Sequence, residues 1–362
     1  MDAKKRIVWM DIARTVAVVF VVVCHVIETE YYTVRTSSLI ISDAVWYFEN
    51  IFFTFGRLGV PLFLMLTGAL MLNREYNIKQ FYKKSLLPLF LTTELWTIIN
   101  YFYYCAQNSA EFSAKNLLYN MTFIRTSPLN HMWYMPMILG VYLVLPFLSK
   151  ALKDVSFTDI LLPLTISFGA FSIVPIFNAF AGEVVSFFPD ANLVLNVGFL
   201  GGLYGVMVIL GHYIGKENIL KKVPSIVIFL IFIISFIFNT LGARYFYLHE
   251  LFHSDVFGWY TSPFIIIASI CLFELIKRID ITDCPKTISL ISKGSFAIYL
   301  IHNLVLISFN YLLREHQLFT NCNFVALSLI RFIVSFGIPF FIIVIADILP
   351  FKKLKKIILY MK

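Results

Sequence analysis

The feature that most constrains this chain is a series of long, nearly uncharged apolar runs that recurs along its whole length. The hydrocarbon core of a bilayer is about 30 Å thick, and a helix needs about 20 apolar residues to cross it. A helix also satisfies its own backbone hydrogen bonds where no water is present. We therefore expect an all-α polytopic membrane protein with about ten transmembrane helices, at approximately Val8–Ile27, Trp46–Leu72, Phe81–Tyr104, Met132–Leu148, Ile160–Phe180, Leu195–Ile214, Val223–Leu241, Trp259–Ile276, Ile288–Leu313 and Phe324–Leu349.

The composition excludes an ordinary soluble protein. The chain is 59% hydrophobic and 14% charged, whereas soluble domains are about 45–50% apolar and about 25% charged. A net charge of +8 would suit a nucleic-acid partner, but the basic residues lie in short loops between apolar runs. They do not form the solvated basic face that nucleic acid requires. The partner that this composition predicts is the lipid bilayer, with no nucleic acid.

Charge asymmetry predicts the orientation, because Lys and Arg accumulate in cytoplasmic loops. With ten helices and a cytoplasmic N-terminus, twenty basic residues fall inside and five outside. Both termini are then cytoplasmic. The first run has no small-residue cleavage site, so we expect an uncleaved helix. The sequence thus predicts one multi-pass domain over residues 1–362, with no appended soluble domain, in the cell (plasma or inner) membrane.

Charged side chains within the predicted spans are the first candidates for function. Insertion scales assign a cost of about 2.5–3.5 kcal/mol to each, and Arg14, Arg57 and Glu94 are the clearest examples. Arg14 and His25 are eleven residues apart, which is about three helical turns and about 16 Å along the axis, so they share one face. Asp11 lies one turn before Arg14 and is its expected partner. By the predicted topology Arg14 faces the cytoplasmic half and His25 the outer half.

Histidines of other runs are expected in the same outer half. His131, Trp133 and Tyr134 open the fourth run, and Tyr299 and His302 lie on one face of the ninth. His25, His131 and His302 therefore form a candidate constellation. Plainer interpretations stay open: histidines also serve as hydrogen-bond partners between membrane helices, and Trp133 and Tyr134 suit an interfacial aromatic belt.

Two further polar features have competing interpretations. Arg57 and Glu94 either bind ligands or pair with each other to brace two helices. Lys83 and Lys84 precede Pro88 at the cytoplasmic mouth of the third run. They fit the positive-inside pattern, or a clamp for the phosphates of a cytoplasmic donor. No nucleotide-binding motif or metal-ligand spacing is present in the sequence, so no metal is expected.

Four sequence motifs follow one another along the chain. They are Trp9-Met-Asp11-Ile-Ala-Arg14 followed by His25, Gly59-Val-Pro61-Leu-Phe-Leu-Met-Leu-Thr67-Gly68, His131-Met-Trp133-Tyr134, and Ile291-Ser-Lys293-Gly-Ser295-Phe-Ala-Ile-Tyr299-Leu-Ile-His302. Pro61 within the second motif and Gly56-Arg57 just before it interrupt the second run, where we expect a kink or break. Together the four motifs give this sequence a resemblance to the acyltransferase 3 family of bacterial membrane proteins. Within that family, the chain is similar to the branch of the enterobacterial-common-antigen O-acetyltransferase.

The resemblance implies transfer of an acyl group, usually acetyl from cytoplasmic acetyl-CoA, to a hydroxyl of an extracytoplasmic or lipid-linked glycan. Acetyl-CoA is then a donor substrate, with no permanently bound cofactor. The family's essential pair corresponds to Arg14 and His25, with His25 as a base or as a transiently acylated relay. Lysines stand at 83 and 84 where arginines are common in the family. The site residues expected are His25, Arg14, His302 and Tyr299 for catalysis, Arg14, Arg57, Lys83 and Lys84 for the donor, and His131, Trp133, Tyr134 and Glu94 for the acceptor.

Two other classes of function remain open at this point. Buried arginines, a glutamate and histidines also build transport pathways, so a transporter or flippase of a glycan or small solute is the alternative. Against it, the chain lacks paired interrupted helices in corresponding halves. The second is a non-catalytic scaffold for glycan assembly. The sequence also leaves open the acceptor glycan and whether the chain forms a homo-oligomer.

Overall fold

The computed structural model of this chain is helical, with no strand among the residues that it describes. These residues are 7–36, 41–125, 127–181, 202–251, 256–319, 322–350 and 358–360. The expected all-α membrane class is thereby confirmed. The predicted span at 195–214 begins outside the described residues, which contain its later part as α11 (Gly202–Gly215).

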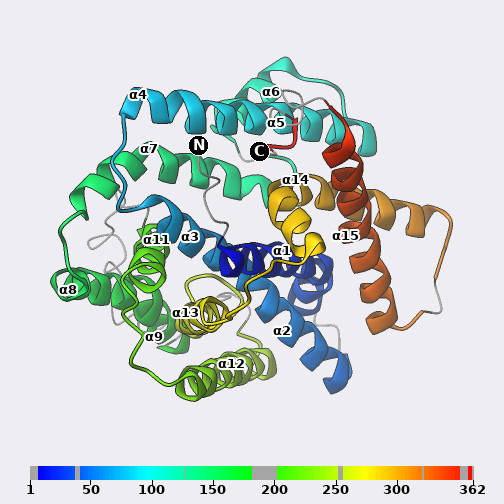
Figure 1. Ribbon diagram of the computed structural model, residues 1–362. Coiled ribbons are helices and arrows are strands. Elements are labelled where there is room, and N and C mark those ends of the chain that lie inside the picture. Colours follow the sequence, from blue (N-terminus) through cyan, green and yellow to red (C-terminus); the bar gives the residue numbers. More distant parts are fainter. Residues whose placement is uncertain are drawn as a thin grey trace. The chain divides into compact units, whose positions relative to one another are not determined.

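The helices gather into two compact units, each built from two stretches of chain (Figure 1). The first unit comprises 1–74 and 148–292, and the second comprises 75–147 and 293–362. Helices α7 (Tyr134–Ala151) and α14 (Lys286–Glu315) contain the second and third boundaries, and the first lies between Arg74 and Glu75. The first unit holds α1 (Val8–Thr36), α2 (Asp43–Arg57), α3 (Gly59–Met71), α8 (Phe157–Phe168), η3 (Gly169–Ile173), α9 (Val174–Ala181), α11, α12 (Ser225–Leu248) and α13 (Pro263–Lys277). The second holds α4 (Ile78–Phe81), η1 (Tyr82–Leu86), α5 (Leu87–Gln107), α6 (Ala114–Met121), η2 (Asn130–Trp133) and α15 (Phe324–Ile348).

Seven helical segments of the described chain are long and apolar enough to cross a membrane. They correspond to seven of the ten predicted runs. The other three runs correspond to shorter or more polar helices, α5, α11 and α13, so the count of ten stays a prediction. The seven segments are Val8–Glu28, Asp43–Met71, Asn130–Ala151, Phe157–Phe180, Ser225–Leu248, Lys286–Glu315 and Phe324–Ile348.

The break predicted in the second run is confirmed at Leu58. This residue ends α2 and precedes α3, and its amide donates to Phe55 and Gly56 in place of a regular helical bond. Pro61 stands in the first turn of α3. Proline is tolerated at the start of a helix but disrupts its interior. The sequence around Pro61 therefore favours a break between α2 and α3 within the segment Asp43–Met71.

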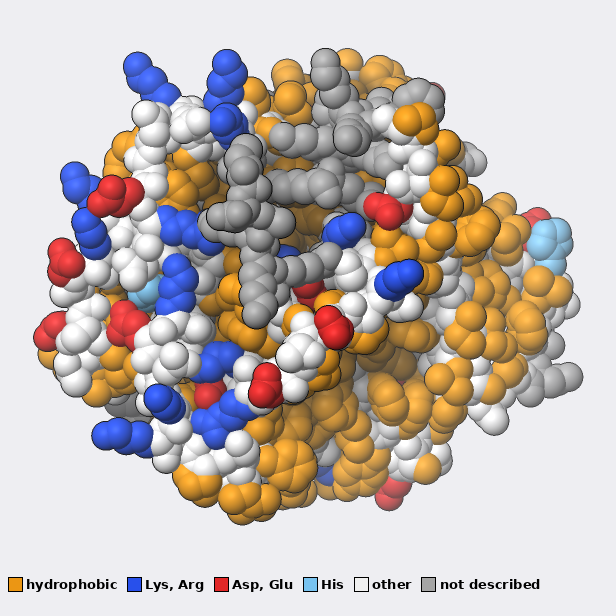
Figure 2. Space-filling model, viewed as in Figure 1, with side chains coloured by type: hydrophobic (Ala, Val, Ile, Leu, Met, Phe, Trp, Pro, Cys, Tyr) orange, Lys and Arg blue, Asp and Glu red, His pale blue; other side chains and the backbone are white. Residues whose placement is uncertain are grey.

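One end of the first unit gathers basic residues through side-chain bonds to helix termini. Lys277 Nζ donates to the carbonyl of Ile214 at 2.6 Å, at the end of α11. Arg278 donates to the carbonyls of Leu220 and Val223 at 2.7 and 2.8 Å. Cations in such positions satisfy carbonyls that lack helical partners. Figure 2 shows Lys and Arg side chains on the face viewed, beside extensive hydrophobic surface. The orientation of the chain in the membrane stays a prediction.

At the centre of the first unit, α1 packs against α2, α3 and α13, and α3 packs closely on α11 (Figure 1). The contact between α3 and α11 requires Gly68. A Cβ atom at this position would lie 1.7 Å from the carbonyl oxygen of Val208. The two backbones approach as closely as they do because no side chain separates them, which is typical of membrane helix pairs with small residues at the interface.

We expect Gly68→Ala to destabilise the protein by more than about 3 kcal/mol, since overpacking of this severity forces the two backbones apart. Gly140→Ala in α7 is the matched control, because a Cβ there meets nothing within 4 Å. Thermal unfolding in detergent, followed by fluorescence-detected size exclusion, measures both. Equal midpoints for the two variants would contradict the packing described here.

Candidate functional site

The candidate catalytic residue His25 lies where α1 and α2 approach most closely. A Cβ atom at Gly56 would lie 2.6 Å from Cα and Cβ of Cys24, the neighbour of His25. Only glycine permits this spacing. Arg57 follows Gly56 directly and is thus brought beside the same turn of α1. The local sequence Gly56-Arg57 therefore both allows the contact and supplies its charged side chain.

The imidazole of His25 is held in one orientation. Its Nδ1 lies 2.9 Å from the carbonyl oxygen of Val21. A carbonyl only accepts, so Nδ1 carries the hydrogen and the lone pair of the neutral ring is on Nε2. Nε2 faces the carboxylate of Glu28, with 4.0 Å to Oε2. The side chain of His25 is 13% exposed, so the imidazole is largely enclosed.

Arg57 completes this group from α2. Its Nη2 lies 3.5 Å from Oε1 of Glu28, and its Nη1 donates to the hydroxyl of Tyr260 at 3.4 Å. The guanidinium stands over the rings of Phe53 at 4.4 Å and Trp259 at 4.7 Å. These cation–π contacts compensate for lost hydration, which matters because the Arg57 side chain is only 2% exposed.

The resulting row of imidazole, carboxylate and guanidinium has the parts of a general base. Nε2 of His25 can take a proton, and the carboxylate of Glu28 can stabilise the imidazolium that forms. Arg57 holds the carboxylate in place and balances its charge. One sequence prediction paired Arg57 with Glu94. In the structure, the carboxylate that lies beside Arg57 is that of Glu28.

Arg14, near the start of α1, forms an ion pair of its own. Arg14 Nη1 lies 3.8 Å from Oδ1 of Asp11, which confirms the predicted pair. Ser292 Oγ donates to the same oxygen of Asp11 at 2.6 Å, and Thr15 Oγ1 donates to the carbonyl of Ile288 at 3.3 Å. The start of α14 is thereby tied to α1. The Arg14 side chain is 33% exposed.

In the second unit the structure brings together His131, Tyr299 and His302. The hydroxyl of Tyr299 donates to the carbonyl of His131 at 2.5 Å, and the two histidine rings stand edge to face at 5.5 Å. Nδ1 of His302 donates to the carbonyl of Tyr299 at 2.7 Å. The amide of Asn303 donates to Nδ1 of His131 at 2.8 Å. These bonds hold η2 against α14 and favour a positioning role.

The remaining aromatic acceptor candidates adjoin this cluster. The ring of Tyr134 lies 5.5 Å from that of Tyr299, and the ring of Trp133 stands edge-on to Tyr134 at 6.2 Å. His131 and His302 are thus grouped as predicted, whereas the inclusion of His25, which belongs to the other unit, stays a prediction.

Glu94 belongs to a buried polar stripe on α5. Thr93, Glu94, Thr97, Asn100 and Tyr101 are all buried and span about 120° of the helix surface at 100° per residue. Oε1 of Glu94 and both amide atoms of Asn100 have no hydrogen-bond partner within the described chain. A buried polar group without a partner costs about 1–3 kcal/mol. The stripe is therefore suited to water or a ligand rich in hydroxyl groups.

Lys83 and Lys84 project from η1, a π-helical turn, and both are exposed. This placement fits either of their predicted roles. Among the described residues no group of three His, Cys, Asp or Glu side chains has the geometry to hold a metal ion.

Sequence reasoning did not single out Glu28, Tyr260, Asn100 or Asn303. Glu28 had a usable signal, since it stands three residues after His25 on the same helix. Glu28 lies just beyond the predicted apolar run, which ends at Ile27. Tyr260 and Asn303 acquire their roles through contacts with distant segments, which no local pattern indicates.

Comparison with known proteins identifies the family of this chain. Residues 7–346 match the family model described as an acyltransferase domain, which extends from the start of α1 to near the end of α15. No curated protein and no solved structure matches the chain. The match covers the helices that carry Arg14, His25, Arg57 and the histidine cluster, and the chain is therefore a membrane acyltransferase that belongs to the acyltransferase 3 family.

Proposed function

We propose that this protein transfers an acetyl group from cytoplasmic acetyl-CoA to a hydroxyl of a cell-surface or lipid-linked glycan, in the cell membrane, with His25 as general base. The observation that carries the proposal is the row formed by His25, Glu28 and Arg57 in a chain of the acyltransferase 3 family. A histidine with a fixed tautomer and a carboxylate beside its basic nitrogen is suited to deprotonating a hydroxyl.

The transfer balances with these groups alone. Nε2 of His25 takes the proton of the acceptor hydroxyl while the oxygen of that hydroxyl attacks the carbonyl carbon of the thioester. The new C–O bond forms, the C–S bond breaks, and the CoA thiolate takes the proton from the imidazolium to leave as the thiol. A relay through an acetylated His25 is the variant of this scheme. Trapping of an acetyl-imidazole in the absence of acceptor would distinguish it.

Glu28 can offset part of the cost of charging His25, a cost that burial and the nearby charge of Arg57 increase. An imidazolium and a carboxylate about 4 Å apart attract by about 4 kcal/mol at an effective dielectric constant of about 20. The His25–Glu28 separation is 4.0 Å, and the attraction exists only after His25 has gained its proton. Because it favours the transition state over the resting state, this contact accelerates the reaction.

Donor and acceptor are assigned to different residues. Arg14, one-third exposed and about 16 Å from His25 along α1, is suited to the phosphates or carbonyls of CoA, and the exposed Lys84 is suited to the same groups. The polar stripe of α5, with Glu94 and Asn100, is suited to sugar hydroxyls, which can satisfy its buried groups.

We expect His25→Ala to lower kcat by about 10²–10⁴-fold, the usual contribution of a general base, while the protein stays folded. Purified protein in liposomes, labelled acetyl-CoA and glycan fractions provide the assay. His316→Ala, at the exposed end of α14, is the matched control. Full activity of His25→Ala would remove this residue from the mechanism. A wild type that transfers no label yet moves an unmodified solute would replace the enzyme with a transporter.

Glu28→Gln should lower kcat about 10–100-fold with little change in the KM for acetyl-CoA or for the glycan acceptor. The amide keeps a polar contact with Arg57 but cannot stabilise an imidazolium. Glu28→Asp is expected to restore part of the rate. Glu315→Gln, an exposed site on α14, controls for the loss of a charge. If Glu28→Gln changes only the KM values, Glu28 binds substrate and does not assist His25.

Arg14→Gln should raise the KM for acetyl-CoA about tenfold and change kcat little, since a donor contact made equally in the ground and transition states contributes to binding alone. Arg74→Gln removes an exposed charge on the same predicted side of the membrane and should leave both constants unchanged. An unaltered KM for the donor in Arg14→Gln would exclude Arg14 from the donor site.

A further inference from the structure

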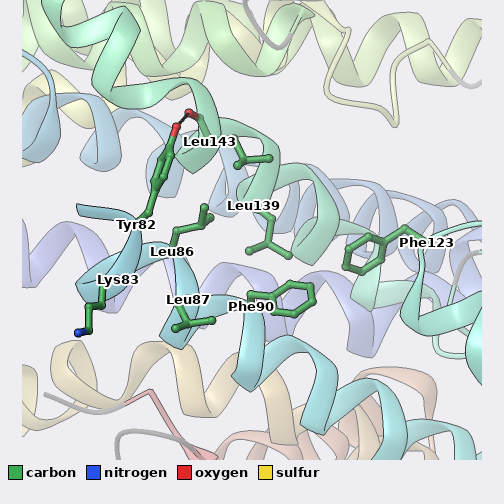
Figure 3. A pocket seen from close by; sticks show the side chains of 8 residues that line it. All are labelled: Tyr82, Lys83, Leu86, Leu87, Phe90, Phe123, Leu139 and Leu143. Carbon is green, nitrogen blue, oxygen red and sulfur yellow. Dashed lines mark hydrogen bonds between the residues drawn. The ribbon is translucent and has the colours of Figure 1, made fainter. Parts of the chain in front are cut away.

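The second unit contains an apolar groove that the proposed reaction does not use (Figure 3). It has a volume of about 460 Å³ and lies between the η1–α5 segment and α7, with Phe123 at one end. This volume is within the range of about 300–1,000 Å³ typical of ligand sites. The lining residues are Tyr82, Lys83, Leu86, Leu87, Phe90, Phe123, Leu139 and Leu143.

The walls of the groove are held apart at a fixed spacing. The hydroxyl of Tyr82 donates to the carbonyl of Leu143 at 2.8 Å and ties η1 to α7. Leu86 and Phe90 are four residues apart on one wall, as are Leu139 and Leu143 on the other, so each pair lies along one helix face. A π-helical turn at η1 adds a residue to the helix where it meets α7, a distortion that is frequent at functional sites.

The groove is open and apolar, with charge at one end only. Phe90 is 39% and Leu143 51% exposed, so an occupant can enter from the surrounding bilayer. Lys83 is the single charged residue of the lining, and Figure 3 shows its ammonium pointing away from the leucine and phenylalanine side chains. Lys79 and Lys84 add positive charge nearby, and no acidic residue occurs from Tyr76 to Thr93.

An apolar groove with a lysine at one end favours some components of the bilayer over others as its ligand. Lipid tails are as apolar as the leucine and phenylalanine side chains that line the groove, so an acyl chain from the bilayer suits the apolar part and is held there by van der Waals packing. Clustered lysines next to a membrane segment attract anionic headgroups of the cytoplasmic leaflet. A zwitterionic headgroup would bring its own cation towards Lys79, Lys83 and Lys84. Charge complementarity therefore favours an anionic phospholipid.

We propose that this groove binds an anionic phospholipid, with one acyl chain between α5 and α7 and the headgroup phosphate at Lys83. Neighbouring residues of a helix point about 100° apart, and Lys84 does not line the groove. The two lysines are thereby assigned different ligands, and Lys84 alone remains for the donor. The lipid site requires no acyl transfer and stands independently of the proposed reaction.

Native mass spectrometry of the full chain tests the proposal with dioleoyl-phosphatidylglycerol and dioleoyl-phosphatidylcholine as probes. We expect a retained phosphatidylglycerol with at least fivefold preference over phosphatidylcholine. Lys83→Gln should reduce that preference about fivefold, as one lysine near a membrane surface contributes about that much. Leu143→Trp, which fills the groove from an exposed position, should abolish retention of both lipids.

Lys153→Gln, in the first unit, is the control and should bind lipid as the wild type does. Equal retention of the two lipids by the wild type would overturn the proposal. So would an unchanged preference in Leu143→Trp, since the lipid would then be held by surface charge alone. Displacement of the bound lipid by acetyl-CoA would likewise overturn it and make the groove part of the donor site.

Discussion

The buried charge of Arg57 is the constraint on which the centre of the first unit depends. A guanidinium enclosed in apolar surroundings costs several kcal/mol unless it is paired and hydrogen-bonded. Arg57, 2% exposed, meets Glu28 from α1 and the hydroxyl of Tyr260 from the segment before α13. Three elements must therefore pack together to accommodate one side chain. The same packing places a carboxylate next to His25, so stability and the proposed chemistry depend on a shared contact.

This sharing limits how the site can be altered. Removing Glu28 altogether would leave Arg57 as an uncompensated buried charge, which is strongly destabilising. A glutamine at the same position retains a hydrogen-bond acceptor for Arg57, but it removes the negative charge that balances Arg57 as well as the charge that His25 requires. Gly56 is limited in the same way, because any side chain there would push α2 from α1 and separate Arg57 from Glu28.

Local features of the sequence were predicted well, and features that depend on helix packing were not. The break at Leu58 and the Asp11–Arg14 pair follow from residues within one or two turns. The partner of Arg57 does not, because Glu28 and Glu94 are equally plausible carboxylates until the helices are packed. The three runs that fall short of a confirmed span include α5, where buried polar residues interrupt the apolar pattern. The same buried polar residues that lower the apolar character of α5 also make it a candidate for binding sugar.

The geometry of α1 has a consequence for the proposed reaction. Arg14 and His25 belong to one helix that is continuous from Val8 to Thr36, and its first span contains no proline at which it could bend. The separation of about 16 Å between them is therefore set by helical rise. A donor whose phosphates stay at Arg14 must extend its thioester along α1 towards His25. The acceptor then has no need to cross the membrane, because only the acetyl group travels.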